Sequence, residues 1–142
     1  MGTRSTITFT EKFRDQETPL VSIYQQYDGY IKGVGHDLAR WLLKKKLING
    51  IGFEDKNDGS VANGVGCLAA QFIRDNKLEV GGLYITSPYE TEDYNYNVII
   101  NDALTGSLDD ITTIRVTQFD EEEPIFIGTP NELLNFNEEW ED

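Results

Sequence analysis

Apolar and polar positions alternate along the first part of the chain with the period of a half-buried β-strand. This period covers Ser5–Phe13 and returns, with strand-forming residues, over Leu20–Tyr27. Turn-forming residues separate the two at Asp15–Pro19, so we expect a hairpin. Asp28 and Gly29 should end the hairpin, with Gly29 at the positive φ of a tight reversal.

The period then lengthens to that of amphipathic helices, which we expect over His36–Ile48 and Val65–Lys77. Lys44–Lys46 would lie in the last turn of the first helix, where cations complement the helix dipole. Asn63 is placed to cap the second helix. Between the helices, Gly50–Asn63 is expected to be a loop.

Strand patterns return in the second half, and a short helix follows them. A turn at Thr105–Ser107 should join two of the strands, and Thr129 and Pro130 have the residue types of an N-cap and a first helical position. The expected strands are Leu83–Thr86, Tyr94–Asn101, Ile111–Phe119 and Ile125–Gly128. The order predicts an α+β fold in which an antiparallel sheet of five to six strands carries two central helices on one face.

The length and composition of the chain indicate a single acidic domain. The chain has 142 residues and a net charge of −13, and we expect one domain over residues 1–137 with an acidic tail at 138–142. The charge is uneven, because residues 1–77 hold 11 basic and 9 acidic residues (+2) and residues 78–142 hold Arg115 against 16 acidic ones (−15). This distribution disfavours an extended nucleic-acid footprint and an anionic membrane, yet leaves the first half able to bind a small anion.

The chain has one cysteine, Cys67, and one histidine, His36. These counts exclude an intrachain disulfide framework and the usual zinc sites, so we expect no metal and no cofactor. No stretch approaches the ~20 apolar residues of a membrane span, and no leader pattern begins the chain. We therefore expect a cytoplasmic protein without a membrane partner.

A local pattern occurs twice, at Gly33–Ala39 and Gly64–Ala70, and each copy opens a predicted helix. Glycines there would let an anion approach the free N–H groups of a helix start. Close packing of the helix start on the sheet is the alternative. Nearby tyrosines could stack on a base while arginines take phosphates, although tyrosines are also ordinary strand residues. The candidate ligand-binding residues are Gly33, Gly35, His36, Arg40, Gly64, Gly66, Cys67, Arg74, Tyr27 and Tyr30.

His36 and Cys67 follow the two glycine motifs at matching positions, which raises the idea of a Cys–His dyad. Antiparallel helices would hold the two helix starts apart, and a dyad needs hydrogen-bond reach. We therefore expect no catalytic residues and no enzymatic activity, and keep a Cys–His hydrolase as a remote alternative.

Several strings of the sequence resemble those of a known family. They are MGTRSTI at Met1–Ile7, QYDGY at Gln26–Tyr30, GVGH at Gly33–His36, NGVGCLAAQ at Asn63–Gln71 and GGLY at Gly81–Tyr84. Together they resemble a family of small uncharacterised proteins carried by phages and by bacteria with mobile elements. The resemblance implies a biological setting and assigns no activity or catalytic residue.

These observations favour a non-enzymatic, phage-type accessory protein that inhibits bacterial defence by sequestering a small nucleotide-like signalling molecule. The alternative is an acidic inhibitor that mimics nucleic acid or blocks a basic surface of a host defence protein. Exposed strand edges and a small size leave self-association as a homo-oligomer open.

Overall fold

A six-stranded mixed sheet forms the framework of the protein in a computed structural model, which describes residues 2–50, 59–101, 105–119 and 121–137. Its order is β5-β2-β1-β6-β8-β9. The strands are β1 (Ser5–Phe13), β2 (Gln16–Gln25), β5 (Leu83–Thr86), β6 (Tyr94–Asn101), β8 (Thr112–Gln118) and β9 (Phe126–Gly128). The α+β class is confirmed. The prediction of an antiparallel sheet is wrong at one pair, because β1 and β6 are parallel while the other four neighbouring pairs are antiparallel.

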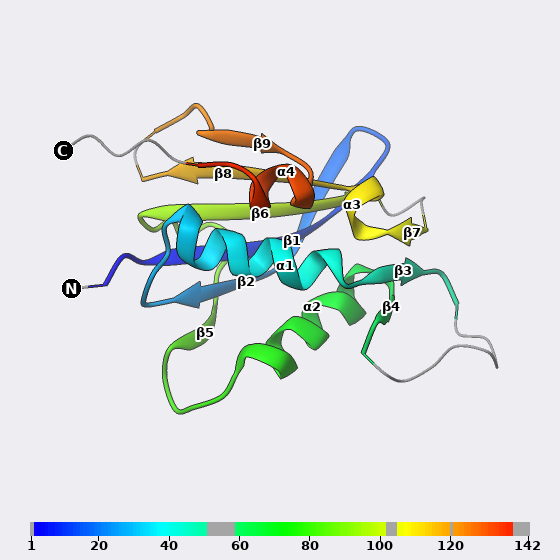
Figure 1. Cartoon of the computed structure of the whole chain (residues 1–142), viewed down its shortest axis with the longest axis horizontal. Coiled ribbons are helices and arrows are strands. Elements are labelled where there is room, and N and C mark those ends of the chain that lie inside the picture. Colours follow the sequence, from blue (N-terminus) through cyan, green and yellow to red (C-terminus); the bar gives the residue numbers. More distant parts are fainter. Residues whose placement is uncertain (1, 51–58, 102–104, 120, 138–142) are drawn as a thin grey trace.

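The principal helices lie on one face of this sheet (Figure 1). A turn of π-helix, η1, leads directly into α1, and α4 packs beside α1. A second sheet of order β4-β3-β7 lies where α1 ends and α2 begins. These elements are η1 (Ile31–Gly35), α1 (His36–Leu43), β3 (Lys46–Ile48), β4 (Val61–Asn63), α2 (Gly64–Asn76), β7 (Gly106–Ser107), α3 (Leu108–Ile111) and α4 (Pro130–Leu134).

The β1–β2 hairpin is longer and tighter than the sequence predicts. Arg14 takes the positive φ of the reversal, 57°, so Gln16–Pro19 belongs to β2 and not to the turn. A bulge accommodates Pro19, because the register shifts there and leaves Leu20 as the extra residue. Proline lacks the N–H that regular strand pairing needs and is tolerated at a bulge.

The end of the hairpin reverses the expected roles of two residues. Asp28, and not Gly29, has the positive φ, 58°. Gly29 is required for space, because a Cβ there would lie 2.9 Å from the carbonyl oxygen of Arg4.

Helix α1 ends five residues earlier than its periodicity predicts, at Leu43. Lys46 joins β3, and its N–H donates to the carbonyl of Ser60. Lys45 is buried beside Asp75 instead of lying in a solvated last turn. Tertiary contacts therefore outweigh the dipole argument for Lys45 and Lys46, while Lys44 lies exposed at the C-cap of α1.

Helix α2 begins within one residue of the expected start, but Asn63 does not cap it. The side chain of Asn63 accepts a hydrogen bond from the N–H of Gly50 (2.8 Å). The predicted loop Gly50–Asn63 lies partly outside the described residues, and its last three residues form β4. The acidic tail at 138–142 also lies outside them.

The second half follows the predicted strands closely. The turn at Thr105–Ser107 is instead β7 followed directly by α3. At α4, Thr129 accepts from the N–H of Glu132 (3.1 Å), and the Glu132 carboxylate accepts from the N–H of Thr129 (3.0 Å). This capping box confirms the predicted helix start.

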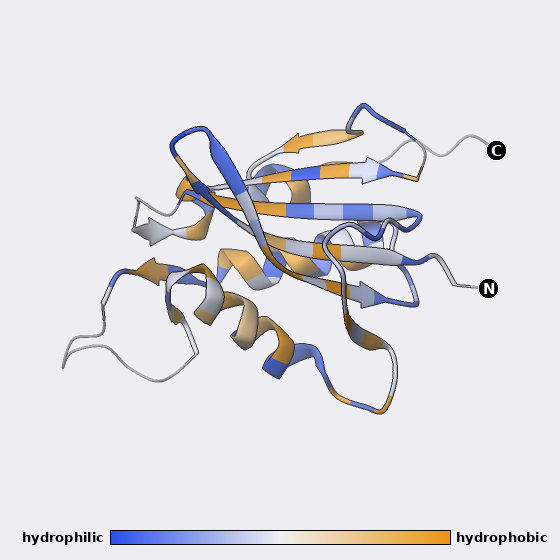
Figure 2. Cartoon of the chain, turned by 180° about the vertical axis from the view of Figure 1, so that it is seen from behind, coloured by the Kyte–Doolittle hydropathy of each residue, from blue (hydrophilic) through white to orange (hydrophobic). Residues whose placement is uncertain are grey.

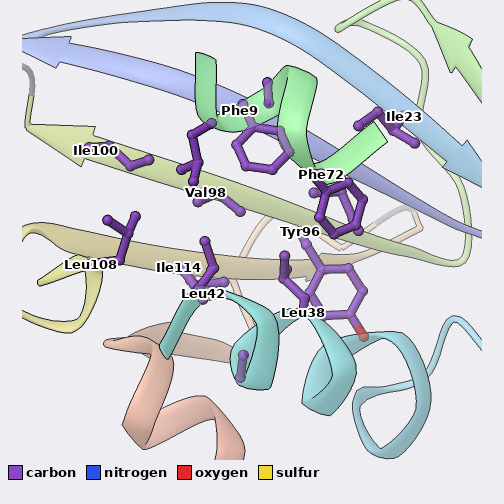
Figure 3. Close-up of a cluster of buried hydrophobic side chains, with 14 of the residues drawn as sticks. Phe9, Ile23, Leu38, Leu42, Phe72, Tyr96, Val98, Ile100, Leu108 and Ile114 are labelled. Atoms are coloured by element: carbon purple, nitrogen blue, oxygen red, sulfur yellow. The ribbon is translucent and has the colours of Figure 1, made fainter. Parts of the chain in front are cut away.

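Phe72 of α2 joins the layers of the core (Figure 3). Its ring centroid lies 5.6 Å from that of Phe9 on β1 and 5.1 Å, edge-on, from that of Trp41 on α1. Tyr96 of β6 is buried in the same core, and its hydroxyl donates to the carbonyl of Gly29 (2.6 Å). Within the described ranges, no helix has the length and apolar character to cross a membrane.

Tyr96→Phe should lower the free energy of unfolding by about 1–2 kcal/mol, because it leaves the buried carbonyl of Gly29 without this donor. Urea denaturation measures the change. Tyr89→Phe is the matched control, since Tyr89 is 88% exposed. Equal stability of the two variants would contradict a structural role for the Tyr96 hydroxyl.

Candidate functional site

A cleft of about 370 Å³ opens at the end of β2, beside the C-terminal end of α2. The turn that leads from α2 to β5 forms its other wall. The cleft is lined by Gln25, Tyr27, Asn76, Leu78, Glu79, Gly81, Gly82 and Leu83. Its volume lies in the range of small-molecule sites, roughly 300–1,000 Å³.

The wall formed by the α2–β5 turn has a defined shape. Gly81 and Gly82 both have positive φ, 94° and 78°, which a side chain would strain. Lys77 Nζ donates to the carbonyls of Gly81 (3.1 Å) and Leu83 (2.9 Å). The N–H of Gln26 donates to the carbonyl of Gly82 (3.3 Å), which ties the turn to the end of β2.

The floor of the cleft contains an unsatisfied acceptor. Gln25 Oε1 is buried and has no hydrogen-bond partner among the residues that the structure describes. Gln25 and Asn76 also line a smaller inner cavity of about 60 Å³ that reaches Leu38 and Phe72. Asn76 Nδ2 donates to the carbonyl of Phe72 (2.8 Å), so its Oδ1 and its second Nδ2 hydrogen are left for a ligand. A ligand that satisfies Gln25 Oε1 would therefore need an N–H or O–H donor.

The rim of the cleft is partly apolar. Tyr27 is 62% exposed and Leu78 is 84% exposed. Exposed aromatic and aliphatic side chains beside a cleft can cover the flat face of a ligand. Asp37 lines the inner cavity and is held by Arg40, with 3.0 Å between Oδ1 and Nη1. The cleft thus combines an aromatic face with an excess of acceptors.

Of the predicted ligand-binding residues, Tyr27 lines this cleft. Arg40 is paired with Asp37, which lines the smaller inner cavity and not the cleft. Tyr30 donates instead to Asp28 Oδ1 (3.0 Å). This hydrogen bond to a carboxylate raises the pKa of the Tyr30 phenol. Tyr30 lies at the start of η1 and does not line the cleft.

The first glycine motif serves close packing. The N–H groups of Gly33 and Gly35 both donate to the carbonyl of Tyr30 (3.0 and 3.5 Å). A Cβ at Gly33 would lie 2.2 Å from the carbonyl oxygen of Asp28, and one at Gly35 would lie 3.1 Å from the Tyr96 ring. Their amides are engaged within the protein, which favours the packing alternative for this motif.

The second glycine motif has a different environment. Gly64 has a φ of 84°, and a Cβ at Gly64 or Gly66 would meet nothing within 4 Å. These glycines lie at the start of α2, whereas the cleft lies at its other end. The two motifs are therefore alike in sequence only, and the structure does not bring them together.

His36 and Cys67 contact separate parts of the chain. Nε2 of His36 bonds to the carbonyl of Phe136 (3.0 Å), near the C-terminal side of α4. Cys67 lies on α2, 3.8 Å from the Nε2 of Gln71. Helices α1 and α2 run in opposite directions in Figure 1, so their first turns lie at opposite ends of the layer.

Arg74 helps to join α1 and α2. Its Nε donates to Asp75 Oδ1 (2.9 Å), while the indole N–H of Trp41 donates to Asp75 Oδ2 (2.9 Å). Lys45 lies 3.7 Å from the same carboxylate and over the Trp41 ring. Hydrogen bonds from Arg74 and Trp41 lower the pKa of Asp75, and the bond from Arg74 has the larger effect. Arg74 therefore already has an anionic partner.

The sequence did not single out Gln25, Asn76 or Leu78 as site residues. The available signal was the Gly81-Gly82 turn next to apolar residues that follow the end of a helix. The unsatisfied acceptor of Gln25 has no signal in the sequence, because it depends on which residues pack around it.

Alanine at the two glycine motifs should have opposite effects on stability. Gly33→Ala forces a Cβ against a carbonyl oxygen and should destabilise the protein by about 2 kcal/mol or more. Gly66→Ala has open space within α2 and should stabilise it by about 0.5–1 kcal/mol. Urea denaturation compares them, and a similar loss in both variants would contradict the assigned environments.

Asp75→Asn should lower stability at neutral pH by about 1 kcal/mol, since the charged pair is partly exposed. The folded-state pKa of Asp75 lies below its usual 3.8, so its contribution is present above that pH and is lost as the pH falls through the folded-state value. The difference in unfolding free energy between the two proteins should therefore shrink as the pH falls below 3.8. A difference that stays constant below that pH would argue against an electrostatic origin.

Comparison of the chain with protein-family models, with curated proteins and with solved structures gives no match. What the cleft binds must therefore be inferred from its own chemistry: an aromatic face, an apolar rim and a floor of hydrogen-bond acceptors.

Proposed function

We propose that the protein is a non-enzymatic binder of a small nucleotide-like molecule, whose base enters the cleft at the end of β2. The buried, unpartnered Oε1 of Gln25 at the floor of this cleft is the observation that supports the proposal most directly. A buried acceptor left unpaired costs about 1–3 kcal/mol, and a ligand donor would remove that cost.

Each part of the cleft has a counterpart in such a ligand. The Tyr27 ring offers a stacking face, and base–aromatic stacking contributes about 1–3 kcal/mol per base. The amides of Gln25 and Asn76 can pair with a base edge through their free oxygens. Acceptors on the protein favour a base with an exocyclic amino group. The phosphates would point outward, because Glu79 and Asp37 repel them from the interior.

In the biological setting that the sequence suggests, such binding sequesters a signalling molecule. A phage-type accessory protein in the bacterial cytoplasm would inhibit a defence response by tight, reversible capture of its nucleotide-like signal. Capture needs affinity and no chemical step, so this function requires no catalytic residue.

Equilibrium dialysis with adenosine and inosine tests the ligand class, since inosine lacks the exocyclic amino group that the acceptors would bind. We expect adenosine to bind about tenfold more tightly, the equivalent of about one hydrogen bond. Adenosine monophosphate should bind at least as well as adenosine, because its phosphate remains in solvent. Binding of neither nucleoside, or a preference for inosine, would overturn the proposed orientation.

Two variants test the site itself. Tyr27→Ala should weaken adenosine binding by about tenfold through lost stacking, with Tyr89→Ala as an exposed tyrosine control outside the cleft. Gln25→Leu should also weaken binding while raising the free energy of unfolding by about 1 kcal/mol, because an apolar group replaces the unpaired acceptor. A protein that binds no nucleotide but captures a host protein in a salt-sensitive complex would instead favour the acidic-inhibitor alternative.

A further inference from the structure

The face of the six-stranded sheet that the helices do not cover, here called the helix-free face, carries two further cavities. Figure 2 shows the end of the β1–β2 hairpin and the connection from β5 to β6 passing in front of this face. A cavity of about 210 Å³ lies beside the β5–β6 connection and one of about 300 Å³ lies beside the hairpin. Arg115 of β8 lines both cavities and therefore lies between them.

Hydrogen-bond donors gather at the base of the smaller cavity. Asn97 lies directly opposite Arg115 in the pairing of β6 with β8, and both residues line the cavity. Asn97 Oδ1 accepts from the hydroxyl of Thr10 (2.6 Å), which leaves its Nδ2 as the group for a ligand. Thr117, two residues along the same strand as Arg115, lines the cavity with a hydroxyl that has no partner in the described part of the chain.

The remaining polar groups beneath this cavity already satisfy one another. The hydroxyl of Thr6 donates to Asn95 Oδ1 (2.8 Å), and the hydroxyls of Thr8 and Ser22 lie 2.6 Å apart. Asn95 Nδ2 donates to the carbonyl of Glu92 (2.9 Å), which fastens the β5–β6 connection to the sheet. The groups with donors to spare are therefore those around Arg115, and the cavity wall is held in place around them.

Arg115 is weakly compensated. Among the residues that the structure describes, its one contact with an acidic group runs from Nη2 to Glu17 Oε2 at 3.4 Å, whereas strong arginine–carboxylate pairs are bidentate and shorter. Its side chain is 38% exposed, and it is the basic residue of an otherwise acidic second half. Glu17 comes from the hairpin, 98 residues away along the chain, and reaches Arg115 across the helix-free face.

We propose that the smaller cavity is an anion site, in which Arg115, Asn97 and Thr117 bind the phosphate or carboxylate group of a small molecule and Glu17 competes with that group for Arg115. The guanidinium can offer two parallel N–H groups to an oxyanion, and the Asn97 amide and Thr117 hydroxyl add neutral donors beside it. Glu90 lines the same cavity, so a singly or doubly charged group is favoured over a polyanion. This site lies on the opposite side of the sheet from the nucleotide cleft and does not depend on the function proposed for it.

Because Glu17 competes with the anion for Arg115, substitutions of Glu17 and of Arg115 should have opposite effects on anion binding. If the pair only stabilised the fold, neutralising either member would weaken the protein in the same way. If Arg115 binds an external anion, Arg115→Gln removes the site while Glu17→Gln frees it. Glu17→Gln keeps the length of its side chain, and Arg115→Gln keeps a polar side chain that is shorter and uncharged.

Titration of ¹⁵N-labelled protein with inorganic phosphate and, separately, with acetate at low ionic strength measures binding to the full chain by NMR. We expect chemical-shift changes at Asn97, Arg115 and Thr117, at least a tenfold weaker Kd in Arg115→Gln and a several-fold tighter Kd in Glu17→Gln. Arg40→Gln, which alters an exposed arginine of α1 paired with Asp37, should leave the Kd unchanged. Circular dichroism of each variant confirms that it is folded. Asn97→Asp adds a carboxylate to the cavity and should abolish binding, so it replaces Arg115→Gln if that variant proves unstable.

The measured affinities identify the chemical class of the anion and decide whether the proposal stands. Tighter phosphate binding identifies a phosphoryl-bearing ligand, and tighter acetate binding identifies a carboxylate-bearing one. Tyr27→Ala should leave either affinity unchanged, which separates this site from the cleft. The proposal is overturned if neither anion binds the wild type or Glu17→Gln, or if Glu17→Gln and Arg115→Gln weaken binding alike.

Discussion

The parallel pairing of β1 with β6 is the constraint on which the rest of the structure depends. It aligns Ser5 with Tyr94 and continues to Lys12 opposite Asn101, so it joins the N-terminal hairpin to the strands of the second half. A parallel partner cannot be reached through a short turn, and the intervening chain must leave the sheet and return. It does so through α1 and α2 on one face, and through the β5–β6 connection across the other. The cleft and the cavities of the helix-free face are products of that route.

Much of the fold could be predicted from local pattern. Period-two alternation located β1, β5 and β6, helical spacing located α2, and the residue types at Thr129 and Pro130 located the start of α4. The parallel pair could not be predicted, because alternation identifies a strand without identifying its neighbour. The length of α1 was wrong for a related reason. Lys45 suits a solvated last turn locally, but burial beside Asp75 and Trp41 decides its position.

In the candidate sites, too, local sequence predicts some residues, while tertiary neighbours decide the chemistry. Tyr27 was predicted from the sequence as a ligand-binding residue that could stack on a base, and Arg115 was conspicuous as a cation in an acidic segment. The chemistry of both sites depends on which neighbours leave a donor or acceptor unused, as at Gln25 and Asn97. The two Gly-Val-Gly motifs make the point most clearly. Gly33 is enclosed by the chain that precedes it, whereas Gly66 faces open space, and nothing in the motif itself distinguishes the two.

The β1–β6 pairing also sets the order of events during synthesis of the chain. Thr6 and its partner Asn95 are 89 residues apart, which a ribosome adds in roughly 5–20 seconds at typical rates. During that interval β1 can pair with β2, but the backbone groups of β1 that pair with β6 in the folded protein have no strand partner. The nascent chain therefore presents a temporary strand edge that other chains could join until β6 closes it through strongly non-local contacts.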